Sequence, residues 1–386
     1  MEGERNIYDV IVVGAGIEGS ATAYSLAKDG KRTLLLEQFT LPHNRGSSHG
    51  KSRITRRNYG ARTIYANMMK EAFELTAQLE TECREQLFVN CEYLEYGPKG
   101  GSLVTESKQC LTDYHVPHET FDVKEQRKRY PHIELPDNYE FVLEKTGGIL
   151  RADKMLSAFQ SEFVRYGGTI RDGEAMLDLF PGDTVSVKTT RSVHKAQSVV
   201  LTLGAWAAKF LPRLGIKVKL QPEEIKVYYW KHKDNSSRFD HKTYPAFFTK
   251  TAAGKYTIYG LPEDEYPGLV KICLHEGSST DPDKRDGTKN DWVLETMKLI
   301  IATHFPTLEK EPTIAETCIY TNTPDKHFIL DVHPVWKNIV LGAGFSGHGF
   351  KLSPVVGNLL AQLATGQRPS YDMSPFRIHR FFKNKL

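Results

Sequence analysis

The stretch of sequence that decides the fold is Tyr8-Asp9-Val10-Ile11-Val12-Val13-Gly14-Ala15-Gly16-Ile17-Glu18-Gly19. Its apolar and β-branched first half is typical of a strand buried in a parallel sheet. Three closely spaced glycines follow, and a helical pattern begins after them over residues 20–28. The stretch therefore predicts a strand, a glycine turn and a helix, one after another.

A second buried strand is predicted at Thr33-Leu34-Leu35-Leu36-Glu37, after Gly30 has ended the helix. With it the pattern completes a βαβ unit around the spacing G-x-G-x-x-G, whose glycines allow a tight turn and close approach to a pyrophosphate. Glu37 lies 18 residues beyond the last glycine of the turn, where a carboxylate accepts hydrogen bonds from ribose hydroxyls. The unit predicts a site for FAD or NAD and disfavours NADP, but it does not choose between the first two.

A polar loop follows over residues 42–57. Its composition predicts a segment without packed strands or helices, placed to meet an anion. Arg53 and Arg56 are three residues apart, so they would share a face if the loop coils; a solvated basic loop is the alternative. A helix is predicted beyond the loop at residues 63–83.

The nucleotide-binding pattern is interrupted twice further along the chain. Residues 87–144 predict short strands and loops, and residues 216–315 predict an antiparallel sheet because polar and apolar residues alternate there. We therefore predict an α/β fold (α+β overall) with two domains. They are a Rossmann-like FAD-binding domain from residues 1–86, 145–215 and 316–386, and a substrate domain inserted from residues 87–144 and 216–315.

A second glycine turn lies near the end of the chain. A buried strand at residues 338–341 runs into Gly342-Ala343-Gly344-Phe345-Ser346-Gly347-His348-Gly349-Phe350-Lys351. A helix is predicted directly afterwards, with Ser353 as its cap and Pro354 at its first position. Lys351 therefore precedes a helix N-terminus, where an anion would be stabilised.

Two further patterns lie between the glycine turns. Lys271, Cys273 and His275 fall on one side of an extended strand, so a lysine and a histidine would face a cofactor together, or else form the polar outer face of a sheet. Cys318 lies in Thr317-Cys318-Ile319-Tyr320-Thr321-Asn322-Thr323-Pro324-Asp325, just upstream of the second glycine turn. A lone thiol there suggests a covalently tethered flavin, and the alternative is a small buried hydrophobe.

Composition narrows the class of protein. The chain has 386 residues, 40% of them hydrophobic and 25% charged, as in a soluble globular protein of two domains. The formal charge of +4 is small and the basic residues are scattered, so neither nucleic-acid nor membrane binding is expected. No apolar run approaches about 18 residues. The five cysteines lack paired spacing, so we expect no disulfide framework, no metal site and a reducing compartment.

The C-terminal tripeptide Asn384-Lys385-Leu386 is a variant of the Ser-Lys-Leu peroxisomal signal, with an ordinary basic tail as the alternative. An enzyme that forms hydrogen peroxide would favour the targeting interpretation. A peroxisomal location, with the tripeptide bound by an import receptor, is therefore expected, and otherwise a cytoplasmic one.

The chain as a whole resembles the flavoprotein amine and amino-acid oxidases, because two glycine turns enclose two insertions in one nucleotide-binding domain. The resemblance is closest to the monomeric sarcosine oxidase family, with its peroxisomal sarcosine and L-pipecolate oxidases. It covers nearly the whole chain and implies a glutathione-reductase/D-amino-acid-oxidase-like architecture. It is carried by residues 8–19, 47–56, 259–262, 266–271, 318–325 and 342–356.

This resemblance implies roles for particular residues. Cys318 matches the cysteine that forms a thioether with the flavin 8α-methyl carbon, and Arg56 and Lys351 match the pair that holds the substrate carboxylate. Lys271 matches a position associated with oxygen activation. Further catalytic positions are matched by His49, Arg53, Tyr259, His275 and Tyr320, and the FAD-binding residues are Gly14, Gly16, Ile17, Gly19, Glu37, Gln38, Ser47, Gly204, Trp206, Gly344, Gly347, Lys351 and Cys318.

The resemblance also implies an activity. Two electrons would pass from a secondary amino acid to one covalently bound FAD per chain, and O2 would be reduced to hydrogen peroxide. Sarcosine would give glycine and formaldehyde, and L-pipecolate a cyclic imine acid; the sequence does not rank these substrates against L-proline. The alternatives are an FAD-dependent dehydrogenase with a protein electron acceptor and an inactive flavin-binding interaction module. A monomer is expected.

Overall fold

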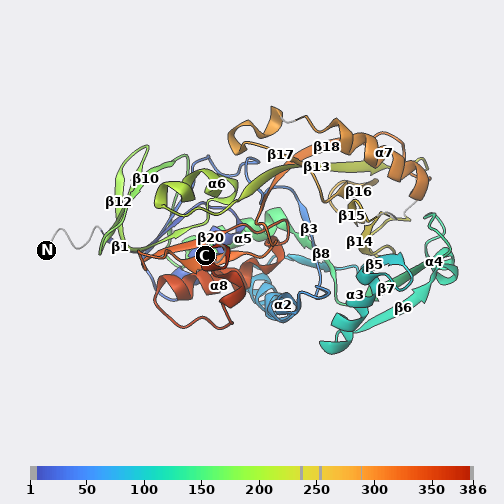
Figure 1. Ribbon diagram of the computed structural model, residues 1–386, viewed down its shortest axis with the longest axis horizontal. Coiled ribbons are helices and arrows are strands. Elements are labelled where there is room, and N and C mark those ends of the chain that lie inside the picture. Colours follow the sequence, from blue (N-terminus) through green and yellow to red (C-terminus); the bar gives the residue numbers. More distant parts are fainter. Residues whose placement is uncertain (1–6, 235–237, 252–253, 288, 383–386) are drawn as a thin grey trace.

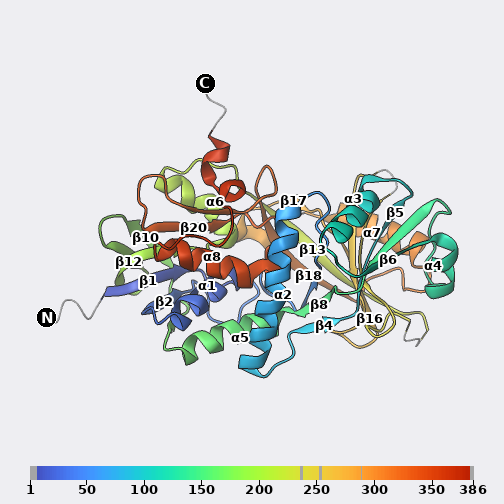
Figure 2. The same ribbon diagram turned by 90° about the horizontal axis from the view of Figure 1, so that it is seen from below.

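The computed structural model describes residues 7–234, 238–251, 254–287 and 289–382. Two large β-sheets lie side by side along the long axis of the molecule, with a small sheet between them (Figure 1, Figure 2). The first large sheet holds the predicted βαβ unit. The second holds the two inserted segments.

The first sheet has eight strands within the described residues. Its buried central strand β1 (Ile7–Val13) pairs in parallel with β2 (Thr33–Leu36) and with β12 (Val193–Leu201). A tight turn joins β1 to α1 (Ile17–Lys28), so the predicted order of strand, glycine turn, helix and strand is confirmed. The other strands are β9 (Thr169–Arg171), β10 (Met176–Phe180), β11 (Val185–Thr189), β19 (Ile329–Val332) and β20 (Ile339–Ala343).

Helices cover both faces of this sheet, because successive side chains of the buried strands point to opposite sides. One face packs against α1, α2 (Thr63–Cys83), α5 (Ala152–Arg165) and α8 (Ser353–Ala364) in a single apolar core. The other face packs against α6 (Ala207–Phe210) and the turns beside it. The N-terminus of α1 thus meets the carboxyl ends of the parallel strands, the edge at which α/β sheets bind ligands. The 3-10 helices are Gly204–Trp206, Leu211–Leu214, Pro282–Gly287, Phe350–Leu352, Ser374–Phe376 and Ile378–Phe381.

The second large sheet has nine strands within the described residues. It is antiparallel except where β14 (Ala246–Lys250) pairs in parallel with β5 (Tyr93–Pro98). That pairing joins the two inserted segments, 87–144 and 216–315, into one sheet. The antiparallel sheet predicted for residues 216–315 agrees with the antiparallel pairing of the strands within that segment. Helix α7 (Asp291–His304) covers one face over a core rich in aromatic residues. The other strands are β6 (His118–Asp122), β7 (Tyr139–Glu144), β13 (Gln221–Lys231), β15 (Thr257–Leu261), β16 (Leu269–Leu274), β17 (Ser278–Ser279) and β18 (Ile314–Asn322).

The prediction that residues 42–57 lack a packed element is wrong for Ser52–Thr55. These residues form β3, which pairs with β8 (Gly148–Arg151) in the small sheet, where β8 also pairs with β4 (Phe88–Asn90). Ser52 and Thr55 are buried, while Arg53 turns to a cavity. Strand pairing satisfies the backbone of a segment whose side chains alone appear too polar to pack.

Two helices inside residues 87–144 were not predicted from the sequence. Helix α3 (Ser102–Asp113) packs an apolar side that includes Val104 and Leu111 on the sheet. Helix α4 (Val123–Arg129) is short, and its N-cap Asp122 accepts a hydrogen bond from the Glu125 backbone nitrogen at 3.0 Å. Helix α4 has only seven residues, and the buried side of α3 includes Ser107, so the apolar periodicity of both is weak in the sequence.

The start of α8 also differs from its prediction. Ser353 is the first helical residue instead of the cap, because the 3-10 turn Phe350–Leu352 leads directly into the helix. Pro354 remains in the first turn, as predicted.

The division into two domains stays a proposal. The boundary placed at residue 316 falls within β18, whose residues pair along their whole length with β13 in the nine-stranded sheet. The C-terminal tripeptide 384–386 lies outside the described residues. None of the described helices is both long and apolar enough to cross a membrane.

Candidate active site

A cavity of about 1010 Å³ runs from the β1–α1 turn to the nine-stranded sheet. Every residue assigned a role from the sequence lines it, although those residues are spread from position 14 to position 351. We call the part around the β1–α1 turn and Glu37 the nucleotide end. The part around Arg53, Arg56, Lys271 and Lys351 is called the charged end.

The nucleotide end is shaped by the close packing of backbone. A Cβ atom on Gly14, whose φ is +101°, would lie 2.3 Å from the Thr202 carbonyl oxygen, and one on Gly19 would lie 1.9 Å from the Gly14 carbonyl oxygen. Neither position accepts a side chain. The Glu37 carboxylate accepts hydrogen bonds from the Ala15 nitrogen at 2.9 Å and the Phe39 nitrogen at 3.0 Å, which fixes the acid beside the turn.

The N-terminus of α1 opens into this end of the cavity. Here the Ile17 backbone nitrogen donates to the Ser48 hydroxyl at 2.9 Å. The first turn of a twelve-residue helix presents backbone donors and partial positive charge, which suits a pyrophosphate. Ser48 was not among the predicted site residues.

The predicted cofactor-binding residues Gly204 and Trp206 lie at the same end, just after β12. The Trp206 ring lies 5.5 Å from the ring of Phe39, and its indole nitrogen donates to Asp283 at 2.7 Å. Gln38 lines the cavity beside Phe39. These contacts close the nucleotide end at its outer side.

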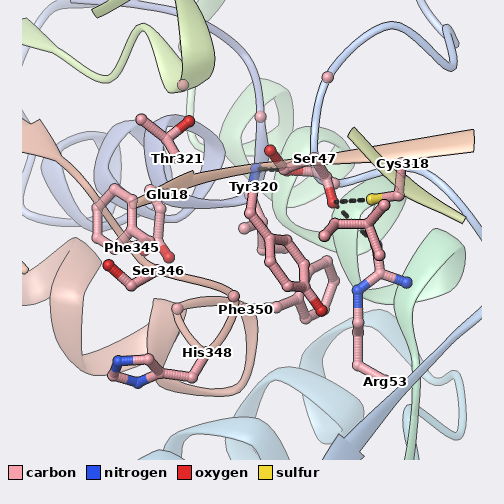
Figure 3. A pocket seen from close by; sticks show the side chains of 18 of the residues that line it. Glu18, Ser47, Arg53, Cys318, Tyr320, Thr321, Phe345, Ser346, His348 and Phe350 are labelled. Carbon is pink, nitrogen blue, oxygen red and sulfur yellow. Dashed lines mark hydrogen bonds between the residues drawn. The ribbon is translucent and has the colours of Figure 1, made fainter. Parts of the chain in front are cut away.

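Glu18 is a second residue that the sequence analysis did not assign. Its side chain lines the cavity, the residue is 7% exposed, and neither carboxylate oxygen has a hydrogen-bond partner among the described residues. Burial raises the pKa of Glu18 to about 8. The acid is therefore protonated at neutral pH, which removes a negative charge from a site suited to phosphates. Figure 3 shows Glu18 near Phe345 and Ser346 of the second glycine turn.

Residues 47–53 join the two ends of the cavity, and Arg53 holds them in place. Its guanidinium donates to the carbonyl oxygens of Ser47 at 2.9 Å, His49 at 2.6 Å and Ser52 at 2.7 Å. His49 reaches the Thr317 carbonyl oxygen at 3.0 Å. Burial first, and then Arg53, lowers the pKa of His49 to about 4, so its imidazole is neutral at physiological pH.

Cys318 lies on β18 directly opposite this loop. Its Sγ is 3.8 Å from the Ser47 carbonyl oxygen, and the residue is 7% exposed (Figure 3). Of the five cysteines, all within the described residues, it is the one that lines the cavity. Strand β18 thus places a single thiol between the two ends.

Arg56 and Lys351 meet around one aromatic ring at the charged end. The Arg56 guanidinium carbon lies 4.9 Å from the Tyr59 ring centroid, and the Lys351 Nζ lies 5.7 Å from it. Lys351 donates to the His348 carbonyl oxygen at 3.5 Å, and no described carboxylate pairs with it. Burial first, and then Arg56 and Arg53, lowers the pKa of Lys351 well below its usual value. An anion bound here would oppose that shift.

An aromatic wall stands beside these two cations. The Tyr320 hydroxyl lies 3.3 Å from Nδ1 of His275, and the ring of Tyr259 lies 6.3 Å from the His275 ring. A Cβ atom on Gly347, whose φ is +76°, would lie 2.7 Å from the Tyr320 ring. Burial first, and then Lys351, lowers the pKa of His275 to about 4, so this imidazole is also neutral at physiological pH. Gly344, with φ of +67°, also lines the cavity, where an added Cβ atom would lie 2.3 Å from the Thr323 side chain.

Lys271 lies on β16 and is 5% exposed. Its Nζ donates to the Glu265 carboxylate at 3.1 Å and to the Ser52 hydroxyl at 3.2 Å. The strand spacing predicted Lys271, Cys273 and His275 on one side. Lys271 and His275 line the cavity, whereas Cys273 is buried in the core beside β13. The sequence analysis did not find Glu265, because nothing in the local pattern indicates that this acid folds back onto a lysine six residues later.

The residues that sequence reasoning missed are Glu18, Ser48, Tyr59 and Glu265. Glu18 could have been identified from the sequence, because an acidic residue within a glycine turn is unusual at a phosphate-binding site. Ser48 and Tyr59 depend on contacts between segments that are distant in the sequence, and Glu265 depends on how the connection between β15 and β16 folds onto Lys271. No pattern in one sequence reports such contacts.

Comparisons with known proteins identify the family. A family model described as FAD dependent oxidoreductase matches residues 9–363. The chain is 45% identical over 384 residues to the peroxisomal sarcosine oxidase of Mus musculus, covering 99% of this chain and 98% of that protein. It is 37% identical to the monomeric sarcosine oxidase of Bacillus sp. (strain NS-129), covering 97% of each.

A solved structure supports the same architecture. NikD, described as an unusual amino acid oxidase essential for nikkomycin biosynthesis, is similar with a TM-score of 0.85 at 25% identity, covering 96% of this chain and 97% of that one. The predicted flavoprotein fold is confirmed. The chain belongs to the FAD-dependent oxidoreductase family. It is therefore a redox enzyme whose cofactor is FAD, and the glycine cradle and helix N-terminus of the nucleotide end fit that dinucleotide.

Proposed function

We propose that the protein is an oxidase of secondary amino acids such as sarcosine and L-pipecolate, with O2 as its electron acceptor. The observation that carries the proposal is the partly buried Arg56 and the buried Lys351 on one aromatic ring in the FAD cavity, where a bound carboxylate would favour the charged form of the lysine. The likeness to proteins named sarcosine oxidase, at 45% and 37% identity over nearly the whole chain, supports the same substrate class.

In this proposal Arg56 and Lys351 bind the substrate carboxylate. Charge-assisted hydrogen bonds are stronger in a buried site than in water, so the carboxylate end is held firmly and the amine end is left to face the cofactor. Tyr59 supports both cations from one side. His275 and Tyr320, which are uncharged, border the space beside Arg56 and Lys351. The positive charge of this part of the site therefore faces the substrate carboxylate.

FAD supplies the acceptor for the two electrons of the amine oxidation. The chain contributes orientation of the substrate, exclusion of water and the cation of Lys271 on a nearby strand, which we assign to the oxygen half-reaction because a fixed positive charge stabilises negative charge that develops on oxygen. Arg53 and His49 keep residues 47–53 against β18.

We further propose that FAD is covalently attached, one per chain, through Cys318. The buried position of this thiol in the cavity and the absence of a disulfide partner support the proposal. Acid precipitation of the purified protein should leave the yellow colour in the pellet. Yellow colour in the supernatant of a fully loaded sample would show that the attachment is wrong.

The dehydrogenase alternative, with a protein electron acceptor, is not favoured by the likeness of the chain to proteins named sarcosine oxidase. Peroxide production separates the two functions. The purified protein should form hydrogen peroxide in air with sarcosine, L-pipecolate or L-proline, and should form far less with dimethylamine, which lacks the carboxylate. Turnover that requires an added acceptor dye, with no peroxide in air, would favour the dehydrogenase.

We propose a peroxisomal location and a monomeric state. The location is supported by the name of the mouse relative, and recognition of Asn384-Lys385-Leu386 by an import receptor is part of the same proposal. A fluorescent fusion with and without this tripeptide tests it by microscopy. Sedimentation of the purified protein tests the monomer.

A further inference from the structure

A chain of hydrogen bonds leads from Lys271 in the cavity to a partly exposed carboxylate on β18. The Lys271 Nζ donates to Oε1 of Glu265 at 3.1 Å, and the Tyr229 hydroxyl donates to Oε2 of the same carboxylate at 2.8 Å. The Tyr229 oxygen also lies 3.3 Å from Oε2 of Glu316, whose other oxygen accepts from the Tyr266 hydroxyl at 3.0 Å. The chain therefore alternates acids and hydroxyl groups without a gap.

Strand register brings these groups together. Tyr229 on β13 is the direct partner of Lys271 on β16, and the Lys271 Nζ lies 5.5 Å from the Tyr229 ring centroid. On the other side of β13, Glu316 pairs with Val227, two residues from Tyr229 and so on the same face of the sheet. Lys271 and Tyr229 are buried, at 5% and 1% exposed, whereas Glu316 and Tyr266 at the far end of the chain are partly exposed. Glu316 also lines the cavity, through which solvent reaches it.

Tyr229 has one hydroxyl hydrogen and two carboxylate neighbours. If it donates to Glu265, its oxygen is free to accept a proton from Glu316. Burial first, and then the charges of Glu265 and Glu316, raises the pKa of Tyr229 above its usual value, so the phenol stays protonated. A buried hydroxyl group between two carboxylates is an arrangement that can relay a proton. Glu265 alone would be enough to position Lys271, whereas Tyr229 connects Glu265 to a second carboxylate, Glu316.

We propose that Glu265, Tyr229 and Glu316 form a proton relay that returns a proton to Lys271 when oxygen is reduced, with Glu265 also positioning the lysine. Reduction of O2 to hydrogen peroxide takes two electrons and two protons. Bound FAD in its reduced form would supply both electrons and one proton, so the second proton is left for the protein to supply. Lys271 gives that proton to oxygen.

The relay resupplies Lys271 within the same reoxidation step, as its proton leaves for oxygen. A proton bound by Glu316 from solvent passes to the Tyr229 oxygen, the original Tyr229 proton passes to Glu265, and Glu265 returns a proton to the lysine. One proton enters from water for each turnover, and every group ends in its starting state. This inference rests on the oxygen half-reaction assigned to Lys271 under the proposed function.

The test uses the holoenzyme reduced with dithionite, so that no amino-acid substrate is needed. Reduced wild type, Tyr229→Phe and Glu316→Gln are mixed with oxygenated buffer in a stopped-flow instrument, in H2O and in D2O. Tyr229→Phe removes one oxygen atom and keeps the ring against Lys271. Tyr228→Phe is the matched control, since this neighbouring tyrosine packs in the other core of the same sheet.

Tyr229→Phe should slow reoxidation by at least about tenfold and increase the solvent isotope effect, because a broken relay leaves proton transfer rate-limiting. Glu316→Gln should change both in the same direction, and Tyr228→Phe should match wild type. Reoxidation of Tyr229→Phe within about twofold of wild type, with an unchanged isotope effect, would overturn the relay.

A different result is expected if the proposed function, and not the relay, is wrong. Wild type that is bleached by no secondary amino acid, but is reoxidised rapidly after dithionite, would contradict the substrate class and leave the relay intact. Wild type that is not reoxidised by oxygen would contradict both.

Discussion

The nucleotide end and the charged end of the cavity are built by different means. At the nucleotide end, backbone nitrogen atoms and glycines from neighbouring positions of one βαβ unit form the surface. At the charged end, side chains from β3, β16, β18 and the second glycine turn converge from distant positions of the sequence. Backbone contacts suit a cofactor that must be retained, whereas charged side chains suit steps in which charge develops.

The largest effect is expected at the charged end, from Lys271→Met. Because the cation matters when negative charge appears on oxygen, reoxidation of the reduced flavin should slow by roughly 10²- to 10³-fold, as for other fixed donors at developing charges. Anaerobic reduction by substrate should change far less. Stopped-flow mixing separates the two half-reactions, and equal losses in both would mean that Lys271 is structural or contacts the substrate.

The carboxylate clamp gives the next effect. Each charge-assisted contact is worth about 1.5 to 3 kcal/mol, so Arg56→Ala and Lys351→Ala should each weaken binding of methylthioacetate about ten- to a hundredfold. Lys351→Ala should do more, because this lysine also borders the cofactor site. Binding is measured from the perturbation of the flavin spectrum.

Lys250→Ala provides the matched control for the clamp, since Lys250 lines the cavity but is exposed. It should bind the inhibitor as wild type does. If Arg56→Ala and Lys351→Ala also bound it as tightly as wild type, the substrate carboxylate would have to lie elsewhere.

At the nucleotide end, the expected effects are on stability. Gly19→Ala forces a Cβ atom to within 1.9 Å of the Gly14 carbonyl oxygen, so the turn must shift at a cost of about 1 to 3 kcal/mol. FAD retention should fall with it. Gly287→Ala, where nothing lies within 4 Å of the added atom, is the control. Urea unfolding compares the two, and equal stabilities would show that the turn is not tightly packed.

Glu18→Gln gives the smallest effect and tests the charge at the nucleotide end. The pKa of Glu18 is raised to about 8 by burial, so wild type has its full stability below the pKa of an unfolded glutamate and loses stability as pH rises toward 8. Glu18→Gln has no carboxyl group to titrate at this position, so its stability does not fall in this way. The free energy of unfolding of the variant should therefore rise relative to that of wild type by roughly 1 to 2 kcal/mol between about pH 6 and about pH 8.

Unfolding at several pH values measures this difference. A constant difference between Glu18→Gln and wild type would show that Glu18 does not titrate there. The buffer series also needs Gly287→Ala, whose pH profile should follow wild type, because this substitution adds no titratable group.

The same contrast explains what could be predicted from the sequence. The βαβ unit and both glycine turns are local patterns, so their positions agree with the structure to within a few residues. The strand Ser52–Thr55 was missed because its polarity hides a pairing with β8, almost a hundred residues away. Helix α4 was missed because it has only seven residues, and α3 because its buried side is partly polar, with Ser107 beside Val104 and Leu111.

The charged end was predicted through the family resemblance and only weakly from local spacing. Lys271 lies on β16 and His275 follows the last residue of that strand; their spacing indicated that they face one way, and both line the cavity. The meeting of Arg56 with Lys351 at Tyr59 depends on how two segments almost three hundred residues apart are packed. Glu265 and Tyr229 depend on strand register, which a single sequence does not report.

The most direct test of the proposed oxidase activity is the visible spectrum of the purified wild-type protein in two anaerobic samples. Sarcosine is added to one sample and L-pipecolate to the other, and air is then admitted to both. The account predicts that at least one of them bleaches the flavin band and that air restores it rapidly with formation of hydrogen peroxide. A flavin that neither amino acid bleaches, or a bleached flavin that air does not restore, would contradict it.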